Sequence, residues 1–279
     1  MQQTGIVIAP MGIGEVLDAG ISLAKRNFRT LAIITAWGAI PSYAAIDIAG
    51  AMVQSSRTSL VVLGVILAIL GFVGLGLLSA AVTIGCARLI EPAEGQDHLD
   101  PTELYALSAL RLWPLALLVL VWLLLATPFV ILLPLGIYIA VRWAMSYTAV
   151  VIEGAGPIES LRRSWAITRG AWWHTAIVAV AGTLITAILG FVLSGLSGAV
   201  VSIVGGATGI QALAGAISIA GKSLALIATE PFSAGIIVVL YYELRARSEG
   251  FDLAQRVARF PAPAETDSSS HSSLTRRAT

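Results

Sequence analysis

Apolar and polar positions alternate along this chain in long blocks, not residue by residue. Apolar runs close to or above the ~20 residues of one membrane crossing are separated by short polar intervals. The runs cover about residues 30–53, 60–90, 114–132, 135–152, 175–203 and 224–244. We therefore predict six transmembrane helices, and an all-α polytopic membrane protein.

Three amphipathic segments divide these runs into pairs. They cover about residues 13–28, 101–113 and 157–170. In the first, apolar residues recur every three or four positions and charged residues lie opposite them. Asp100, Pro101 and Glu103 give the second an N-cap, a first-turn proline and a capping-box acid. The pattern predicts three hairpins, each preceded by a helix that lies in the membrane interface.

The third amphipathic segment carries a basic and aromatic surface. Its apolar side is predicted from Ile158, Leu161 and Trp165, although Ile167 interrupts that pattern. The candidate face for lipid or a partner consists of Arg162, Arg163, Trp165, Arg169, Trp172 and Trp173. Arginine attracts anionic headgroups and tryptophan favours the membrane interface, so this face is typical of contact with a lipid surface.

A weak threefold pattern accompanies the hairpins. Glu91, Glu153 and Glu249 each follow one of them. A structural repeat would explain this, and so would the general preference of membrane boundaries for polar and aromatic residues.

Composition excludes a soluble domain of this size. The chain has 279 residues, of which 57% are hydrophobic and only 12% charged, and its mean hydropathy is +0.87. The net charge of +1 hides an asymmetry, because nearly all basic residues lie in intervals on one side of the predicted spans. Arg57 lies in an opposite loop. The positive-inside rule then places both termini and all three amphipathic segments in the cytoplasm.

The two ends differ from the membrane domain, which we assign to residues 11–254. Residues 1–10 form an N-terminal tail without the basic residue of a cleavable signal peptide. Residues 255–279 are rich in Pro, Ser and Thr and are predicted to be disordered.

Three charged residues within the spans form a candidate intramembrane polar site: Asp47, Arg142 and Glu230. Lys222 lies near the outer end of the last span. Because an unpaired charge in hydrocarbon is costly, each should have a partner, and we hypothesise that Arg142 pairs with Asp47 or Glu230. We favour an interhelical salt bridge over a substrate or ion pathway.

Signatures of enzymes and metal sites are missing from the sequence. Cys86 is the lone cysteine, and the three histidines lie in separate intervals without metal-ligand spacing. His174, after two tryptophans, is interpreted as an interfacial residue. No nucleophile elbow, phosphate-binding loop or dinucleotide motif occurs. We therefore predict no catalytic residues, no cofactor and no nucleic-acid partner.

Three segments, at about residues 12–28, 150–173 and 240–254, resemble the bacterial membrane-domain family named for glycerophosphoryl diester phosphodiesterases. The signature residues are Glu153, Gly154, Gly170, Tyr242, Arg245, Arg247, Glu249, Gly250 and Asp252. In phosphodiesterases that carry it, such a domain stands beside a separate catalytic barrel, for which this chain has no room. The resemblance implies a bacterial inner-membrane location and a membrane module without the hydrolase.

These features predict a non-enzymatic membrane module that anchors, scaffolds or senses at the lipid surface. Its predicted partners are the bilayer and anionic phospholipid headgroups, with other membrane proteins or a second copy of the chain as further candidates. A small transporter or channel that uses Asp47, Arg142 and Glu230 is the alternative. A membrane enzyme of glycerophosphodiester or phospholipid metabolism has the least residue-level support.

Overall fold

Helices make up nearly all of the described part of the chain. The computed structural model describes residues 10–92, 99–129, 133–208 and 211–249, and within them it contains helices and no strands. The helices are α1 (Ile13–Arg26), α2 (Phe28–Val53), α3 (Thr58–Ile90), α4 (Pro101–Leu110), α5 (Leu112–Phe129), α6 (Leu133–Trp143), α7 (Ser146–Glu153), α8 (Pro157–Ile167), α9 (Trp172–Thr208) and α10 (Gln211–Glu249). The predicted all-α class is confirmed. Both predicted tails lie at least partly outside the described residues.

Several helices have the length and apolarity of membrane spans. In the described ranges five candidates pass on length and composition, and α4 with α5 forms a sixth if this pair, bent by 56°, is counted as one. The chain is thus a multi-pass membrane protein. The predicted amphipathic helices are present as α1, α4 and α8, each ending two or three residues earlier than expected.

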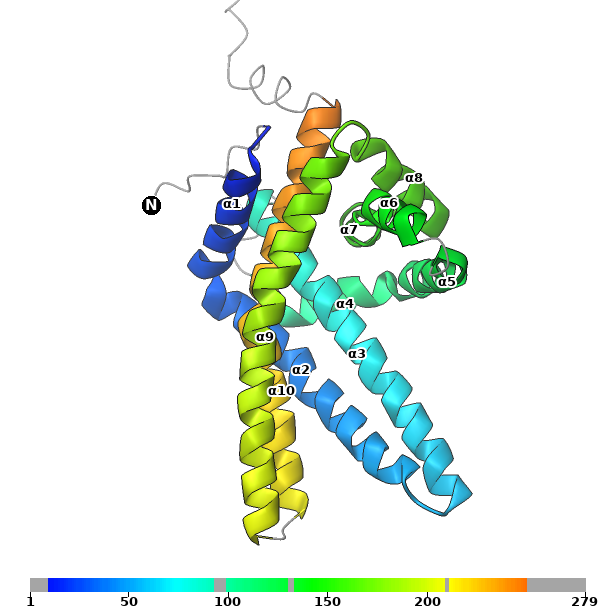
Figure 1. The fold of residues 1–279 in the computed structure, drawn as a ribbon, viewed down its shortest axis with the longest axis vertical. Helices are drawn as coiled ribbons and strands as arrows, with labels where there is room; N and C mark the ends of the chain where they lie inside the picture. The colour runs from blue at the N-terminus through cyan, green and yellow to red at the C-terminus, as the bar shows by residue number, and fades with distance from the viewer. Residues whose placement is uncertain (1–9, 93–98, 130–132, 209–210, 250–279) are drawn as a thin grey trace, which may run out of the picture.

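Two long hairpins frame the molecule. Figure 1 shows α2 beside α3 and α9 beside α10, with the two pairs diverging toward the turn ends. The predicted runs 30–53 and 60–90 match α2 and α3 within two residues. The last predicted run, 224–244, is too short, because α10 begins at Gln211. Residues 211–223, a weakly hydrophobic stretch that the predicted runs leave between two spans, are helical.

The middle pair differs from a straight hairpin. The predicted run 135–152 matches the candidate span Pro134–Glu153, although a short turn after Trp143 divides its helix into α6 and α7. Ser164 of α8 explains the break: its Oγ donates to the Arg142 carbonyl oxygen at 2.7 Å and accepts from the Met145 amide at 3.1 Å. One buried hydroxyl thereby satisfies a carbonyl and an amide freed from the helix. Figure 1 shows α5 nearly end-on, so it runs across the long axis of α9 and α10.

The buried core lies at one end of the molecule. Buried side chains concentrate in the last turns of α3 and α10, where Leu78, Tyr241 and Leu244 are almost fully inaccessible. Toward the turn ends of the hairpins, large apolar side chains point outward, such as Phe72 (64% exposed) and Phe191 (79% exposed). An outward apolar surface of this extent is expected where lipid replaces water as solvent.

Helix α1 packs lengthwise on α10 at this core (Figure 1). The contact is closest at Gly20, where a Cβ atom would lie 2.6 Å from the Ile236 Cα atom. Val16, Gly20, Leu23 and Ala24 form the buried face of α1. The apolar side of residues 13–28 is therefore occupied by another helix over much of its length, which the amphipathic pattern alone did not distinguish from a side facing lipid.

Candidate functional site

Charged side chains from five helices gather around the packed core. They form a set that we call the polar layer: Arg88, Glu91, Glu103, Arg111, Glu153, Arg163, Glu243, Arg245 and Arg247. Arg88 Nη2 lies 2.8 Å from Glu103 Oε1, which joins α3 to α4. These groups follow the apolar stretches of α3, α7 and α10, as expected for the level at which spans leave the membrane.

Glu153 connects the two most specific segments of the family resemblance. Its carboxylate accepts two-pronged hydrogen bonds from Arg163, with Nη2 at 2.9 Å and Nε at 3.1 Å. Arg245 Nη1 from α10 lies 3.9 Å from the same carboxylate. Two signature segments more than 80 residues apart thus meet at Glu153. Gly250 and Asp252 lie outside the described residues, and Glu249 ends α10.

A second carboxylate of the layer, Glu243, was not identified from the sequence. Its side chain is fully buried and binds Arg247 of the same helix. His174 Nε2 lies 3.3 Å from Glu243 Oε2, and the Met11 amide donates to Oε1 at 3.3 Å. Arg247 also donates to the Met11 carbonyl oxygen at 2.6 Å. Glu243 therefore holds together the N-terminal segment, the start of α9 and the end of α10.

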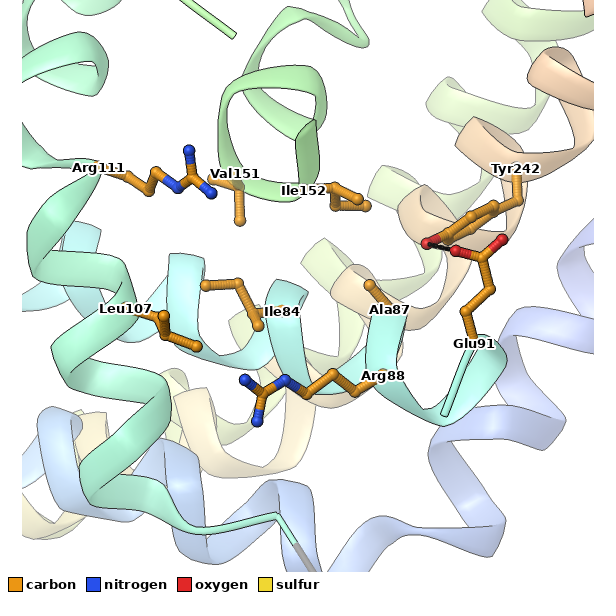
Figure 2. A pocket seen from close by; sticks show the side chains of 9 residues that line it. All are labelled: Ile84, Ala87, Arg88, Glu91, Leu107, Arg111, Val151, Ile152 and Tyr242. Atoms are coloured by element: carbon orange, nitrogen blue, oxygen red, sulfur yellow. Dashed lines mark hydrogen bonds between the residues drawn. The ribbon is translucent and has the colours of Figure 1, made fainter. Parts of the chain in front are cut away.

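An open pocket lies within the polar layer. It has a volume of about 250 Å³ and lies between α3, α4, α7 and α10. Its lining residues are Ile84, Ala87, Arg88, Glu91, Leu107, Arg111, Val151, Ile152 and Tyr242. Figure 2 shows the guanidinium groups of Arg111 and Arg88 above and below the side chains of Ile84 and Leu107, and Glu91 with Tyr242 on the other side of the pocket. Apolar side chains occupy the space between the two charged ends.

The Arg111 side chain lines the pocket without a bound acceptor among the described residues. Its half-buried guanidinium has no ion pair or hydrogen bond within the described ranges. Gly154 explains its position: this residue ends α7 with φ of 73°, and a Cβ atom there would lie 1.7 Å from Arg111 Nη1. Glycine thus permits both the left-handed backbone and the close approach of the guanidinium.

Arg88 adds a second incompletely bonded guanidinium. Although its Nη2 binds Glu103, its Nη1 is buried and lacks a hydrogen-bond partner in the described part of the chain. A buried N–H donor of this kind is expected to find an acceptor. Planar guanidinium groups bind phosphate and carboxylate oxygens well, so the arginine end of the pocket fits a small oxyanion.

The opposite end of the pocket is acidic. The Tyr242 hydroxyl lies 3.1 Å from Glu91 Oε2 and donates to it. Glu91 is otherwise exposed at the end of α3. Within the described residues this one hydrogen bond leaves most of the acceptor capacity of the carboxylate unused, so this end can receive a cationic donor.

The predicted intramembrane site does not assemble. Asp47 of α2 binds Lys222 of α10, and Glu230 lies against Ser79 of α3. Arg142 contacts neither carboxylate: its guanidinium lies 5.2 Å from the ring centre of Tyr138 and 5.1 Å from that of Trp165. The hypothesis that Arg142 pairs with Asp47 or Glu230 is therefore wrong. The span containing Arg142 is present as Pro134–Glu153, but a turn after Trp143 interrupts its helix close to this arginine.

The Asp47–Lys222 pair links the two long hairpins and gives a first prediction. Lys222→Ala should leave the carboxylate unpaired within the spans and destabilise the protein by about 2–3 kcal/mol. Asp47→Ala with Lys222→Ala should regain part of this loss, because no orphaned charge remains. Thermal unfolding in detergent measures both, with exposed Lys25→Ala as the control. A double variant no more stable than Lys222→Ala alone would contradict the pairing.

Only some residues of the predicted lipid face of the third amphipathic segment are exposed, and others contact neighbouring helices. Arg162 and Arg169 are exposed, and Trp173 is 72% exposed. Arg163 instead binds Glu153, and Trp165 lies against Arg142.

The buried side of α8 also differs from the predicted one. It consists of Ser160, Ser164 and Ile167, while Ile158 is 70% exposed. Helix α8 packs through small hydroxyl residues that bind backbone groups, so a count of apolar positions misplaced its inner side.

Two further residues named in the sequence analysis, Gly170 and Trp172, lie at the turn into α9. The Trp172 ring stacks on Tyr138 with a centroid distance of 5.9 Å, and its Nε1 donates to the Tyr138 carbonyl oxygen. Gly170 has φ of 82° in the turn before α9, which favours glycine at this signature position.

Comparisons of the chain with protein families, with characterised proteins and with solved structures find no match. The resemblance to the phosphodiesterase membrane domain therefore stays a prediction, and the geometry of the polar layer is the basis for a functional proposal.

Proposed function

We propose that this protein is a non-enzymatic membrane module that binds phosphate-bearing lipid headgroups at the cytoplasmic surface of a bacterial inner membrane. The observation that carries the proposal is the pair of incompletely bonded arginines, Arg88 and Arg111, which line one open pocket of about 250 Å³. Arginine matches the oxygen geometry of phosphate.

The position of the pocket supports a lipid ligand. The pocket lies where the apolar stretch of α3 ends, beside the start of α5, whose Trp113 and Leu120 are strongly exposed. A headgroup at this level leaves its acyl chains beside the apolar sides of the same helices. The predicted orientation, with basic intervals and both termini in the cytoplasm, places the pocket at the inner leaflet.

The family resemblance is compatible with this proposal. In the proposed reading, the signature residues Glu153, Gly154 and Tyr242 form and position the polar layer, and Gly154 makes room for Arg111. These residues would shape a headgroup-binding site and would not catalyse a reaction. Anchoring or scaffolding of other proteins at the lipid surface would then depend on occupancy of this site.

The intramembrane charges give less support to a transporter. Asp47 and Glu230 have partners on other helices, and Arg142 lies among aromatic rings. Their arrangement therefore favours a structural role.

Arg111→Gln gives a direct test of the proposal. Purified full-length protein is incubated with phospholipids and with diacylglycerol of the same acyl chains, and bound lipid is counted by native mass spectrometry. We expect phospholipid to be retained in preference to diacylglycerol. Loss of a hydrogen bond between charged groups should weaken binding in the Arg111→Gln variant by about 10- to 100-fold.

Arg57→Gln is the matched control, because this arginine is exposed in the turn between α2 and α3 and does not line the pocket. Its lipid binding should equal that of the original protein. Equal retention of diacylglycerol, or an equal loss in both variants, would contradict a phosphate site at Arg111.

A further inference from the structure

The pocket in the polar layer carries charges of both signs at separate places. Arg88 and Arg111 lie toward one end, and Glu91 lies at the other (Figure 2). The side chains between them, Ile84 and Ile152, are apolar and offer no bonds to a ligand. A ligand that fills the pocket therefore meets donors at one end and an acceptor at the other.

Charge balance limits the ligand further. Arg88 is already paired with Glu103, and Glu91 opposes Arg111, which has no ion pair among the described residues. The described charges of the pocket and its direct partners therefore sum to zero. A strongly anionic headgroup would gain at the arginine end and be repelled by Glu91. A zwitterion with phosphate at one end and ammonium at the other matches both ends.

The size of the pocket agrees with a short zwitterion. A volume of about 250 Å³ corresponds to about eight water molecules, and a phosphate joined to an ammonium by two carbons has a similar number of heavy atoms. Among the described residues Glu91 accepts one hydrogen bond, from Tyr242, and retains further acceptor positions. A primary ammonium donates hydrogen bonds to such a carboxylate, whereas a trimethylammonium group has no N–H to donate.

We propose that the pocket recognises the phosphoethanolamine group, with phosphate on Arg88 and Arg111 and the primary ammonium on Glu91. This inference rests on the proposed function and specifies its ligand. Glu91 is then the residue that determines specificity, and Tyr242 positions it. The same group can reach the pocket as a phospholipid headgroup or as soluble phosphoethanolamine.

Competition in nanodiscs tests the assignment. Full-length protein in phosphatidylcholine nanodiscs is titrated with phosphatidylethanolamine or phosphatidylglycerol of matched chains, and bound lipid is measured by native mass spectrometry. We expect a preference of about tenfold for phosphatidylethanolamine over the other two. Glu91→Gln should abolish that preference while leaving binding of phosphatidylglycerol intact or stronger. Glu159→Gln, an exposed acid on α8, should change neither.

A second variant guards against loss of folding. Tyr242→Phe retains the Glu91 carboxylate and should keep the preference for phosphatidylethanolamine, weakened at most by a few fold. Unfolding temperatures of all variants in the same detergent identify any that misfold. Binding of soluble phosphoethanolamine that depends on Arg111 and Glu91, without binding of phosphatidylethanolamine, would support the same recognition and assign a soluble source.

Failure of the inference is distinct from failure of the proposed function. Equal or tighter binding of phosphatidylglycerol that still depends on Arg111 overturns the zwitterion and leaves phosphate recognition standing. Binding of all lipids that is insensitive to both Arg111→Gln and Glu91→Gln overturns both.

Discussion

Gly20→Ala is expected to detach α1 from α10. The added Cβ atom would lie 2.6 Å from the Ile236 Cα atom and 2.8 Å from the Ile236 backbone nitrogen, so no side-chain rotation relieves the contact. Overpacking of this kind costs about 1–3 kcal/mol or more. We expect a lower unfolding temperature in detergent, together with faster proteolysis in α1 as its buried Val16 and Leu23 are exposed.

Gly14→Ala is the matched control on the same helix. A Cβ atom at Gly14 has nothing within 4 Å, and alanine is a better helix former than glycine by about 0.5–1 kcal/mol. This variant should be as stable as the original protein or more so. If Gly20→Ala behaved like Gly14→Ala, the close packing of α1 on α10 would be refuted.

Glu243→Ala should have a comparably large effect. Removal of this fully buried carboxylate takes the ion-pair partner from Arg247 and the acceptor from the Met11 amide at once. Because the Arg247 side chain left behind is 37% exposed and can meet water, we expect a cost of about 1–3 kcal/mol, mainly from the lost hydrogen bonds. Thermal unfolding should show the loss, and a cysteine placed at Met11 should become more reactive toward a soluble thiol reagent.

Two further variants sharpen this result. Glu243→Gln keeps an acceptor oxygen for the Met11 amide and should retain more stability than Glu243→Ala. Glu159→Ala removes an exposed carboxylate and should change stability by less than about 0.5 kcal/mol. Unfolding temperatures of Glu243→Ala and Glu159→Ala that coincide would show that the Glu243 cluster contributes nothing to stability.

The helices were predictable because their signal is local. Runs of apolar residues longer than about 20 have few alternatives to a membrane helix, and α2 and α3 match their predicted bounds closely. The break between α6 and α7 was not predictable from the same signal. It depends on Ser164, which lies in another helix and binds backbone groups at Arg142 and Met145. An apolar window contains no information about such a contact.

The polar layer shows the same division between local and long-range information. The sequence assigned Arg88 and Arg111 to one side of the membrane, and it identified Glu153 and Gly154 as signature residues. It did not reveal that Gly154 lies against Arg111, because only the fold brings α7 beside the α4–α5 junction. His174 was interpreted as an interfacial residue, and its neighbour Glu243 lies 69 positions later. A charge contact between distant segments produces no periodic pattern in the sequence, so it cannot be predicted from hydrophobic periodicity.

The bonds between Met11 and α10 also constrain how the protein is made. The N-terminal segment and α1 are synthesised first, yet their binding surface on α10 is synthesised last, more than 200 residues later. At ribosomal rates of about 5–20 residues per second, α1 waits on the order of 10–40 s for its partner. During that interval the apolar side of α1 can leave water only by binding to the membrane interface. The amphipathic pattern of α1 therefore stabilises the nascent chain first, and the contact with α10 in the folded protein afterwards.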